Sequence, residues 1–169
     1  ANPVQGQIWY NTDSSTLKGL GYVATGAWAS GGNLNTARAR LGGSGTQTSA
    51  LGYGGNPSNT RTESYNGSSW TELNDLNNGR YDVGAAGASN TSALAFGGNP
   101  TSAHTETWNG TNWTELNNLN TARTELSGTG VATSALAFGG NPNRNETELW
   151  NGSNWTEVND LNAGRRDLA

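Results

Sequence analysis

The stretch Ser134-Ala-Leu-Ala-Phe-Gly-Gly-Asn-Pro142 occurs at two earlier places in almost the same form. It reads Ser92-Ala-Leu-Ala-Phe-Gly-Gly-Asn-Pro100 in one and Ser49-Ala-Leu-Gly-Tyr-Gly-Gly-Asn-Pro57 in the other. Further residues recur with this stretch at spacings of 42 or 43 positions, namely Trp28, Trp70, Trp113 and Trp155, and Arg38, Arg80, Arg123 and Arg165. A fixed period of this length is typical of repeat architectures. The sequence therefore predicts full repeats at 37–76, 80–119 and 122–161.

Each repeat has the pattern of four short strands. In the last repeat we expect strands over 123–130, 134–138, 146–150 and 154–158. The second strand ends at a Gly-Gly pair, as it does in every full repeat (Gly54 and Gly55, Gly97 and Gly98, Gly139 and Gly140). Between the third and fourth strands, Asn151-Gly152 predicts a hairpin with a type I′ turn. No window has a helical stripe, so the sequence predicts an all-β protein of four-stranded antiparallel sheets.

The repeat resembles the kelch repeat. The shared features are an Arg that opens the inner strand, a Gly-Gly pair after the second strand, and an aromatic residue and a Trp at fixed distances. The resemblance covers roughly residues 34–165 and implies a β-propeller with one blade per repeat. A second, shorter segment, Gly6-Gln-Ile-Trp-Tyr-Asn-Thr12, is similar to a phrase found in phage virion and tail-fibre proteins. That likeness implies a structural protein of a virion.

The ends of the chain predict a fourth, divergent blade within a single domain, 1–169. The N-terminal part contains three strand-like segments, at 7–11, 16–23 and 27–31, and residues 164–169 match the start of an inner strand. Residues 1–34 together with 164–169 would then close a ring of four blades, which leaves no exposed sheet edge. The alternative is that two chains share strands in one eight-bladed ring, so both a monomer and a homodimer are open.

Composition excludes several classes of protein. The 169 residues include 25 Gly, seven Trp and no Cys, so a disulfide framework and a Cys-based metal site are excluded. The net charge of −4 argues against a nucleic-acid partner. No apolar run has the length of a membrane span, and we expect no membrane partner.

The sequence gives little support to catalysis. His104 is the single His, and no Gly-x-Ser-x-Gly elbow is present. We find neither metal-ligand spacing nor a phosphate loop, and expect no metal and no cofactor. Two sets of Glu recur in every full repeat (Glu63, Glu106 and Glu148; Glu72, Glu115 and Glu157). Because an active site needs one asymmetric pair, we expect these carboxylates to face solvent or to pair between blades, including with the repeated Arg.

The aromatic residues of each repeat have two candidate roles. Trp70, Trp113 and Trp155, with Trp28 in the divergent copy, are predicted to pack between neighbouring blades. Trp108 and Trp150 precede the Asn-Gly turn, where partial exposure would let a sugar ring stack on them. Because these Trp recur once per repeat, we favour a packing role over sugar binding.

The predicted binding residues lie on loops, because a propeller gathers its loops at one face. The connections between blades and the loops after the Gly-Gly pairs fall on the same side. The candidates are Asn77, Asn120, Asn162, Arg61, His104 and Arg144. They favour a noncatalytic binding or structural module with a protein or glycan partner. A lectin-like propeller is the alternative, and a glycoside-acting enzyme would need one pocket that breaks the repeat symmetry, for which the sequence offers no candidate.

The repeated Arg also has two candidate roles. Arg38, Arg80, Arg123 and Arg165 each follow an Asn-rich loop and would form a ring around the axis. The five donors of a guanidinium suit it to hold neighbouring loops together. The competing hypothesis is that the ring captures an anion on the axis.

Overall fold

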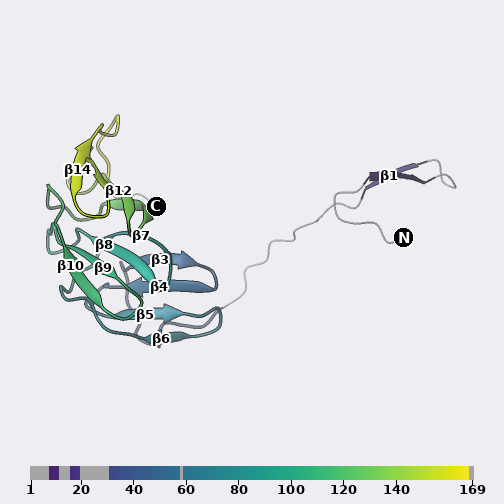
Figure 1. Cartoon of the computed structure of the whole chain (residues 1–169), viewed down its shortest axis with the longest axis horizontal. Helices are drawn as coiled ribbons and strands as arrows, with labels where there is room; N and C mark the ends of the chain where they lie inside the picture. Colours follow the sequence, from purple (N-terminus) through teal and green to yellow (C-terminus); the bar gives the residue numbers. More distant parts are fainter. Residues whose placement is uncertain (1–7, 12–15, 20–30, 58, 168–169) are drawn as a thin grey trace. The chain divides into compact units, whose positions relative to one another are not determined.

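A computed structural model describes residues 8–11, 16–19, 31–57 and 59–167 (Figure 1). The chain divides into two compact units, Ala1–Ser30 and Gly31–Ala169. In the first unit, β1 (Ile8–Asn11) pairs antiparallel with β2 (Thr16–Gly19) in a two-stranded sheet. Trp28, and all but the last residue of the strand predicted at 27–31, lie outside the described residues.

The second unit contains three four-stranded antiparallel sheets, each with its strands in chain order. Sheet I consists of β3 (Gly42–Thr46), β4 (Ser49–Tyr53), β5 (Thr62–Tyr65) and β6 (Trp70–Glu72). Sheet II consists of β7 (Gly84–Ser89), β8 (Ser92–Phe96), β9 (Thr105–Trp108) and β10 (Trp113–Leu116). Sheet III consists of β11 (Ser127–Val131), β12 (Ser134–Phe138), β13 (Thr147–Trp150) and β14 (Trp155–Val158). The prediction of an all-β chain with four strands per repeat is confirmed.

The first strand of each sheet starts later than the sequence predicts. In the last repeat the expected strand began at Arg123, whereas β11 begins at Ser127. Glu125 interrupts the extended backbone with a φ of 57°, and Asp82 (53°) and Arg40 (60°) do the same in the earlier repeats. The left-handed residue bends the chain between the repeated Arg (Arg38, Arg80 or Arg123) and the first strand, so the Arg lies before the sheet and not in it.

The hairpin at each Asn-Gly is present, but its predicted type I′ turn is wrong. The loop between β13 and β14 has four residues, and Gly152 has a positive φ (93°) while Asn151 does not. The Asn151 carboxamide oxygen instead accepts the backbone N–H groups of Ser153 and Asn154, both at 2.9 Å. An Asn side chain that caps its own turn in this way stabilises the longer loop.

Two apolar cores lie between consecutive sheets. Between sheets I and II, Tyr53 meets Trp113 with ring centroids 4.9 Å apart, and Trp108 packs in the same core. Between sheets II and III, Phe96 meets Trp155 at the same distance, with Trp150 beside it. Edge-on aromatic contacts of this kind contribute about 0.5–1.5 kcal/mol beyond the area that they bury. Each junction therefore repeats the same packing with different copies of the same residues.

The first strands, β3, β7 and β11, lie side by side where the sheets converge. Small residues allow this approach. A Cβ added to Gly128 would lie 2.3 Å from the Phe96 ring and 2.8 Å from the backbone oxygen of Ala85. In the described ranges no helix is long and apolar enough to cross a membrane.

Candidate binding face

Each of the three sheets has a buried Arg–Glu pair close to its loops. In sheet II the Arg80 guanidinium lies 3.0 Å from the Glu106 carboxylate, and both side chains are almost fully buried. Arg80 also donates to the backbone oxygens of Gly97 and His104. Burial lowers the pKa of the Arg80 guanidinium, and the charge of Glu106 opposes this effect. The same pairs recur as Arg38–Glu63 and Arg123–Glu148.

The buried carboxylates hold the connections between sheets. Glu106 accepts the backbone N–H groups of Asn77 (2.8 Å) and Asn78 (3.2 Å) and the Asn77 side-chain amide (3.0 Å). Asn120 and Thr121 donate to Glu148 in the same way. Of the two expected environments, exposure to solvent is found for Glu72, Glu115 and Glu157. It is not found for Glu63, Glu106 and Glu148, because the N–H donors and the Arg satisfy these carboxylates inside the protein. The alternative, pairing with the repeated Arg, is what the structure shows.

The Arg also joins consecutive repeats. The Arg80 backbone oxygen accepts from Gly55 N (3.0 Å) and its N–H donates to Asn59 O (2.8 Å), both in the first repeat, whereas its side chain reaches the second. The main chain of Arg165 lies on the third repeat in the same way, through Gly140 N (2.9 Å) and Arg144 O (2.9 Å). The Arg165 side chain is exposed, unlike those of Arg80 and Arg123.

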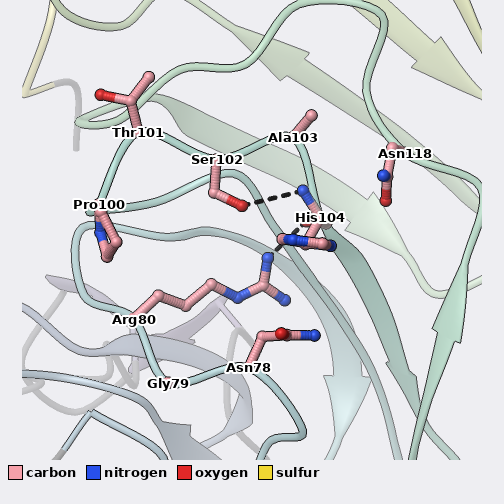
Figure 2. Close-up of a pocket in the computed structure, with 9 residues that line it drawn as sticks. All are labelled: Asn78, Gly79, Arg80, Pro100, Thr101, Ser102, Ala103, His104 and Asn118. Atoms are coloured by element: carbon pink, nitrogen blue, oxygen red, sulfur yellow. Dashed lines mark hydrogen bonds between the residues drawn. The ribbon is translucent and has the colours of Figure 1, made fainter.

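One loop and two connections between sheets line a partly open pocket of about 320 Å³ (Figure 2). Leu119 N donates to Ala103 O (2.9 Å), and Arg123 N donates to Ser102 O (3.0 Å). These bonds hold the loop 100–104 against the connection that follows sheet II. The pocket is lined by Asn78, Gly79, Arg80, Pro100, Thr101, Ser102, Ala103, His104 and Asn118. Its wall is thus made from two connections and one loop.

Glu115, on β10, connects the two sides of this pocket. Its carboxylate accepts the Asn78 side-chain amide at 3.2 Å and lies 2.9 Å from His104 Nδ1. Figure 2 shows the His104 ring between Ser102 and Asn78. The Ser102 hydroxyl accepts the backbone N–H of His104 at 3.0 Å. That bond shapes the loop, and the pocket presents amide, imidazole and hydroxyl groups to a ligand.

The predicted binding residues fall into two groups. The side chains of Asn77 and Asn120 are used inside the protein, since each donates to a buried Glu and to the backbone oxygen of Trp113 or Trp155, both at 3.1 Å. Arg61 pairs with Glu72, and Arg144 lies 2.6 Å from Glu146. Asn162 is exposed. Of the six candidates, His104 lines the pocket.

Asn78, Asn118 and Ser102 also line the pocket; they lie within the loops predicted to form the binding face (74–78, 117–120 and 100–104) but are not among the six candidates. Asn78 and Asn118 lie within the Asn-rich connections, where nothing in the composition separates them from their neighbours. Ser102 has a detectable signal, because it belongs to the loop that differs most between repeats.

The tryptophans before the Asn-Gly turns offer no platform for a sugar. Trp108 and Trp150 are 1% and 0% exposed, and their indole N–H groups donate to Asn90 O and Ala132 O, both at 3.0 Å. Their ring faces are covered by the sheet junctions. Packing is therefore their role.

The part of the chain that the structure describes contains no group of three or more His, Asp or Glu placed to hold a metal ion. No protein-family model matches the chain, and comparison with curated proteins finds no similar sequence.

Proposed function

We propose that this chain is a noncatalytic binding module, built as a kelch-like β-propeller, that holds a polar partner at its loop face. The propeller is supported by three similar sheets that stack through repeated aromatic junctions, with small-residue first strands side by side. The likeness to the kelch repeat rests on the repeated Arg and the Gly-Gly pair. Both occur at the same structural position in all three repeats.

Two ring closures are compatible with these sheets. In the first, residues 1–34 and 164–169 form a fourth blade within one chain. In the second, two chains share strands in an eight-bladed ring. Light scattering distinguishes them, because the first predicts the mass of one chain and the second the mass of two.

The observation that carries the binding role is the polar pocket around His104. Arg80, Glu106 and Glu115 hold both of its sides through hydrogen bonds and ion pairs. A preorganised site loses little conformational entropy when a ligand binds. The exposed groups are short donors and acceptors, which suit the hydroxyl groups of a glycan or the polar groups of a peptide.

The arrangement of the carboxylates supports a noncatalytic role. The three most buried Glu each receive an Arg and backbone N–H donors, so they are fixed as ion pairs and do not face the pocket. A glycosidase needs two carboxyl groups that flank a bound sugar. Among the described residues, the Ser102 hydroxyl accepts the backbone N–H of His104 and makes no hydrogen bond to the His104 ring, whereas a hydrolase pairs its nucleophile with a base.

A lectin-like role is the second candidate, favoured by the amide-rich lining of the pocket. The buried Trp108 and Trp150 remove the stacking surface that many sugar sites use, so recognition would depend on hydrogen bonds. A virion or tail-fibre surface would be a suitable setting for either kind of partner, by the likeness of residues 6–12.

The test is binding of wild type and His104→Ala to a glycan array and a peptide array, with Arg144→Ala as the control in the third repeat. We expect saturable binding to one class of probe, at least tenfold weaker in His104→Ala and unchanged in Arg144→Ala. The bound probe should be recovered intact by mass spectrometry. Consumption of the probe would contradict the noncatalytic role, and binding that ignores His104 would contradict the site.

A further inference from the structure

The outer face of sheet III is an apolar surface that the described sheets leave uncovered. We define it by Leu136, Phe138, Thr147, Leu149 and Val158, which the strand register places on one side of the sheet. Leu149 and Val158 are 39% and 38% exposed, and Val131, opposite Ser134 on the same side, is 41% exposed. These are the three exposed large hydrophobic side chains of the described residues.

The equivalent faces of the other two sheets are buried. In sheet II, Leu94, Phe96 and Thr105 are each 0% exposed because sheet III packs on them. In sheet I, Leu51 and Tyr53 are buried by sheet II. The outer face of sheet III therefore has the residues of a sheet junction without the sheet that should cover them.

A buried hydroxyl identifies what this face accepts. Thr62 Oγ1 accepts the indole N–H of Trp113 at 2.9 Å, and Thr105 Oγ1 accepts that of Trp155 at 2.9 Å. Thr147 occupies the same position in sheet III and is 8% exposed, but its Oγ1 has no hydrogen-bond partner among the described residues. A buried polar atom normally has a hydrogen-bond partner. Because Thr62 and Thr105 each accept an indole N–H, we expect the same donor at Thr147.

The matching surface is on sheet I. Trp70 is the equivalent of Trp113 and Trp155, and the register places it beside Tyr65 and Ala50 on the side of sheet I opposite Tyr53. All three side chains are partly exposed, whereas their equivalents in sheet II (Ala93, Trp108 and Trp113) are at most 5% exposed. The Trp70 indole N–H donates to Gly32 O at 3.1 Å in an exposed position, where a buried acceptor can replace it.

We propose that the outer face of sheet III binds the Trp70 face of a second copy of this chain, with Thr147 Oγ1 as the acceptor of the Trp70 indole N–H. The junction reproduces the two seen within one chain. It is heterologous, since two different surfaces of one chain meet. The inference rests on the propeller-like stacking proposed above but uses a different surface from the His104 pocket, so either proposal can fail alone.

The C-terminal segment has a defined part in this association. Residues 163–167 lie on sheet III as residues 78–82 lie on sheet I, through Gly140 N–Arg165 O and Asp167 N–Glu125 O. In the second copy, residues 36–40 precede sheet I as residues 78–82 precede sheet II, and Arg38 pairs with Glu63. In the proposed junction they would therefore lie where residues 163–167 lie on sheet III. Both segments cannot occupy this place, so the incoming segment displaces residues 163–167. Deletion of 164–169 should therefore strengthen association, whereas a blade closed within one chain would lose its inner strand.

The test is sedimentation equilibrium on the full chain, five single substitutions and the 164–169 deletion. We expect the wild type to associate as its concentration rises, Thr147→Val to weaken association about fivefold, and Trp70→Ala and Phe138→Glu each to abolish it. Thr114→Val, an exposed Thr on β10, is the control and should leave it unchanged. Circular dichroism verifies that each variant is folded.

Mixing the two null variants gives the sharpest result. Trp70→Ala keeps an intact sheet III face and Phe138→Glu keeps an intact Trp70 face, so an equimolar mixture should form a one-to-one dimer although neither variant associates alone. A wild type that stays monomeric at all concentrations overturns the proposal, as does a mixture that stays monomeric. Loss of association in Trp28→Ala but not in Trp70→Ala also overturns it, because residues outside the second unit would then cover the face.

Discussion

The indole N–H of Trp155 donates to the hydroxyl of Thr105 across the junction between sheets III and II, 50 residues earlier in the chain. The same bond joins Trp113 to Thr62 between sheets II and I. Each bond lies beside an aromatic pair in a buried apolar core, so the junction combines apolar packing with one satisfied polar contact.

A double-mutant cycle on Trp155→Phe and Thr105→Val should show that these two residues are coupled. Each substitution removes one partner of a buried hydrogen bond, and we expect a coupling energy of about 0.5–1.5 kcal/mol in the free energy of unfolding. Urea denaturation provides the measurement. Thr147→Val is the matched control and should cost nothing in a monomer, since its hydroxyl has no donor within the described chain. Strictly additive effects would contradict the bond.

Arg123→Lys should destabilise the protein by about 1–3 kcal/mol, because Lys keeps the charge but cannot bond to Glu148, Ala137 O and Glu146 O together. Arg165→Lys is the control, since that side chain is exposed, and should change stability by less than about 0.5 kcal/mol. Sulfate binding, measured by calorimetry, should not differ between the wild type and Arg123→Lys. A stable variant that has lost anion binding would favour the axial anion site instead.

Gly97→Ala should cost about 1–3 kcal/mol in thermal or urea unfolding. Gly97 has a φ of 63°, and an added Cβ would lie 2.8 Å from Arg123 O, the backbone that follows the next connection. Gly43→Ala is the control, because a Cβ there meets its nearest atom at 3.8 Å with no positive φ. Equal effects of the two substitutions would show that the Gly-Gly pair has no special conformational role.

The stability difference between the wild type and Glu146→Gln should shrink as the pH falls. The hydrogen bond from its own backbone N–H and the nearby Arg144 hold the pKa of Glu146 below its ordinary value of 4.5. A lowered pKa in the folded state contributes stability that is present above the ordinary pKa and is lost as the pH falls through the folded one. Urea unfolding of both proteins from about pH 7 to about pH 3 measures the difference. A constant difference across that range would contradict the ion pair.

The strands were predictable because the same strand pattern recurs in all three full repeats. β12 (Ser134–Phe138) has the predicted bounds, and β13 and β14 each begin one residue later than expected. The start of β11 was not predictable, since nothing in Arg123-Thr-Glu-Leu126 signals a left-handed residue at Glu125. The Asn-Gly turn was misjudged because the side chain of Asn151, rather than its backbone conformation, determines the loop.

The buried Arg–Glu ion pairs have a signal in the sequence, which left pairing with the repeated Arg as one of two open environments for these Glu. Arg80 and Glu106 are 26 residues apart, and Arg123 and Glu148 are 25 apart, so each Arg has a Glu at a nearly constant distance along the chain. Two residues of opposite charge that recur at a nearly constant separation in the sequence indicate a contact within each repeat. For the pocket, the sequence places the connections and the loops after the Gly-Gly pairs at one face, but which of their side chains line it depends on contacts that form only in the folded chain.

The exchange rate of the indole protons, followed by NMR on protein with ¹⁵N-labelled Trp, tests most directly that the sheets stack through the Trp–Thr junctions. The monomeric Phe138→Glu variant is the sample, and single Trp→Phe substitutions assign the signals. Trp113 and Trp155 should exchange far more slowly than Trp70, because their N–H groups are buried at Thr62 and Thr105 whereas that of Trp70 is exposed at Gly32. Exchange of Trp113 or Trp155 at the rate of Trp70 would contradict the stacked arrangement.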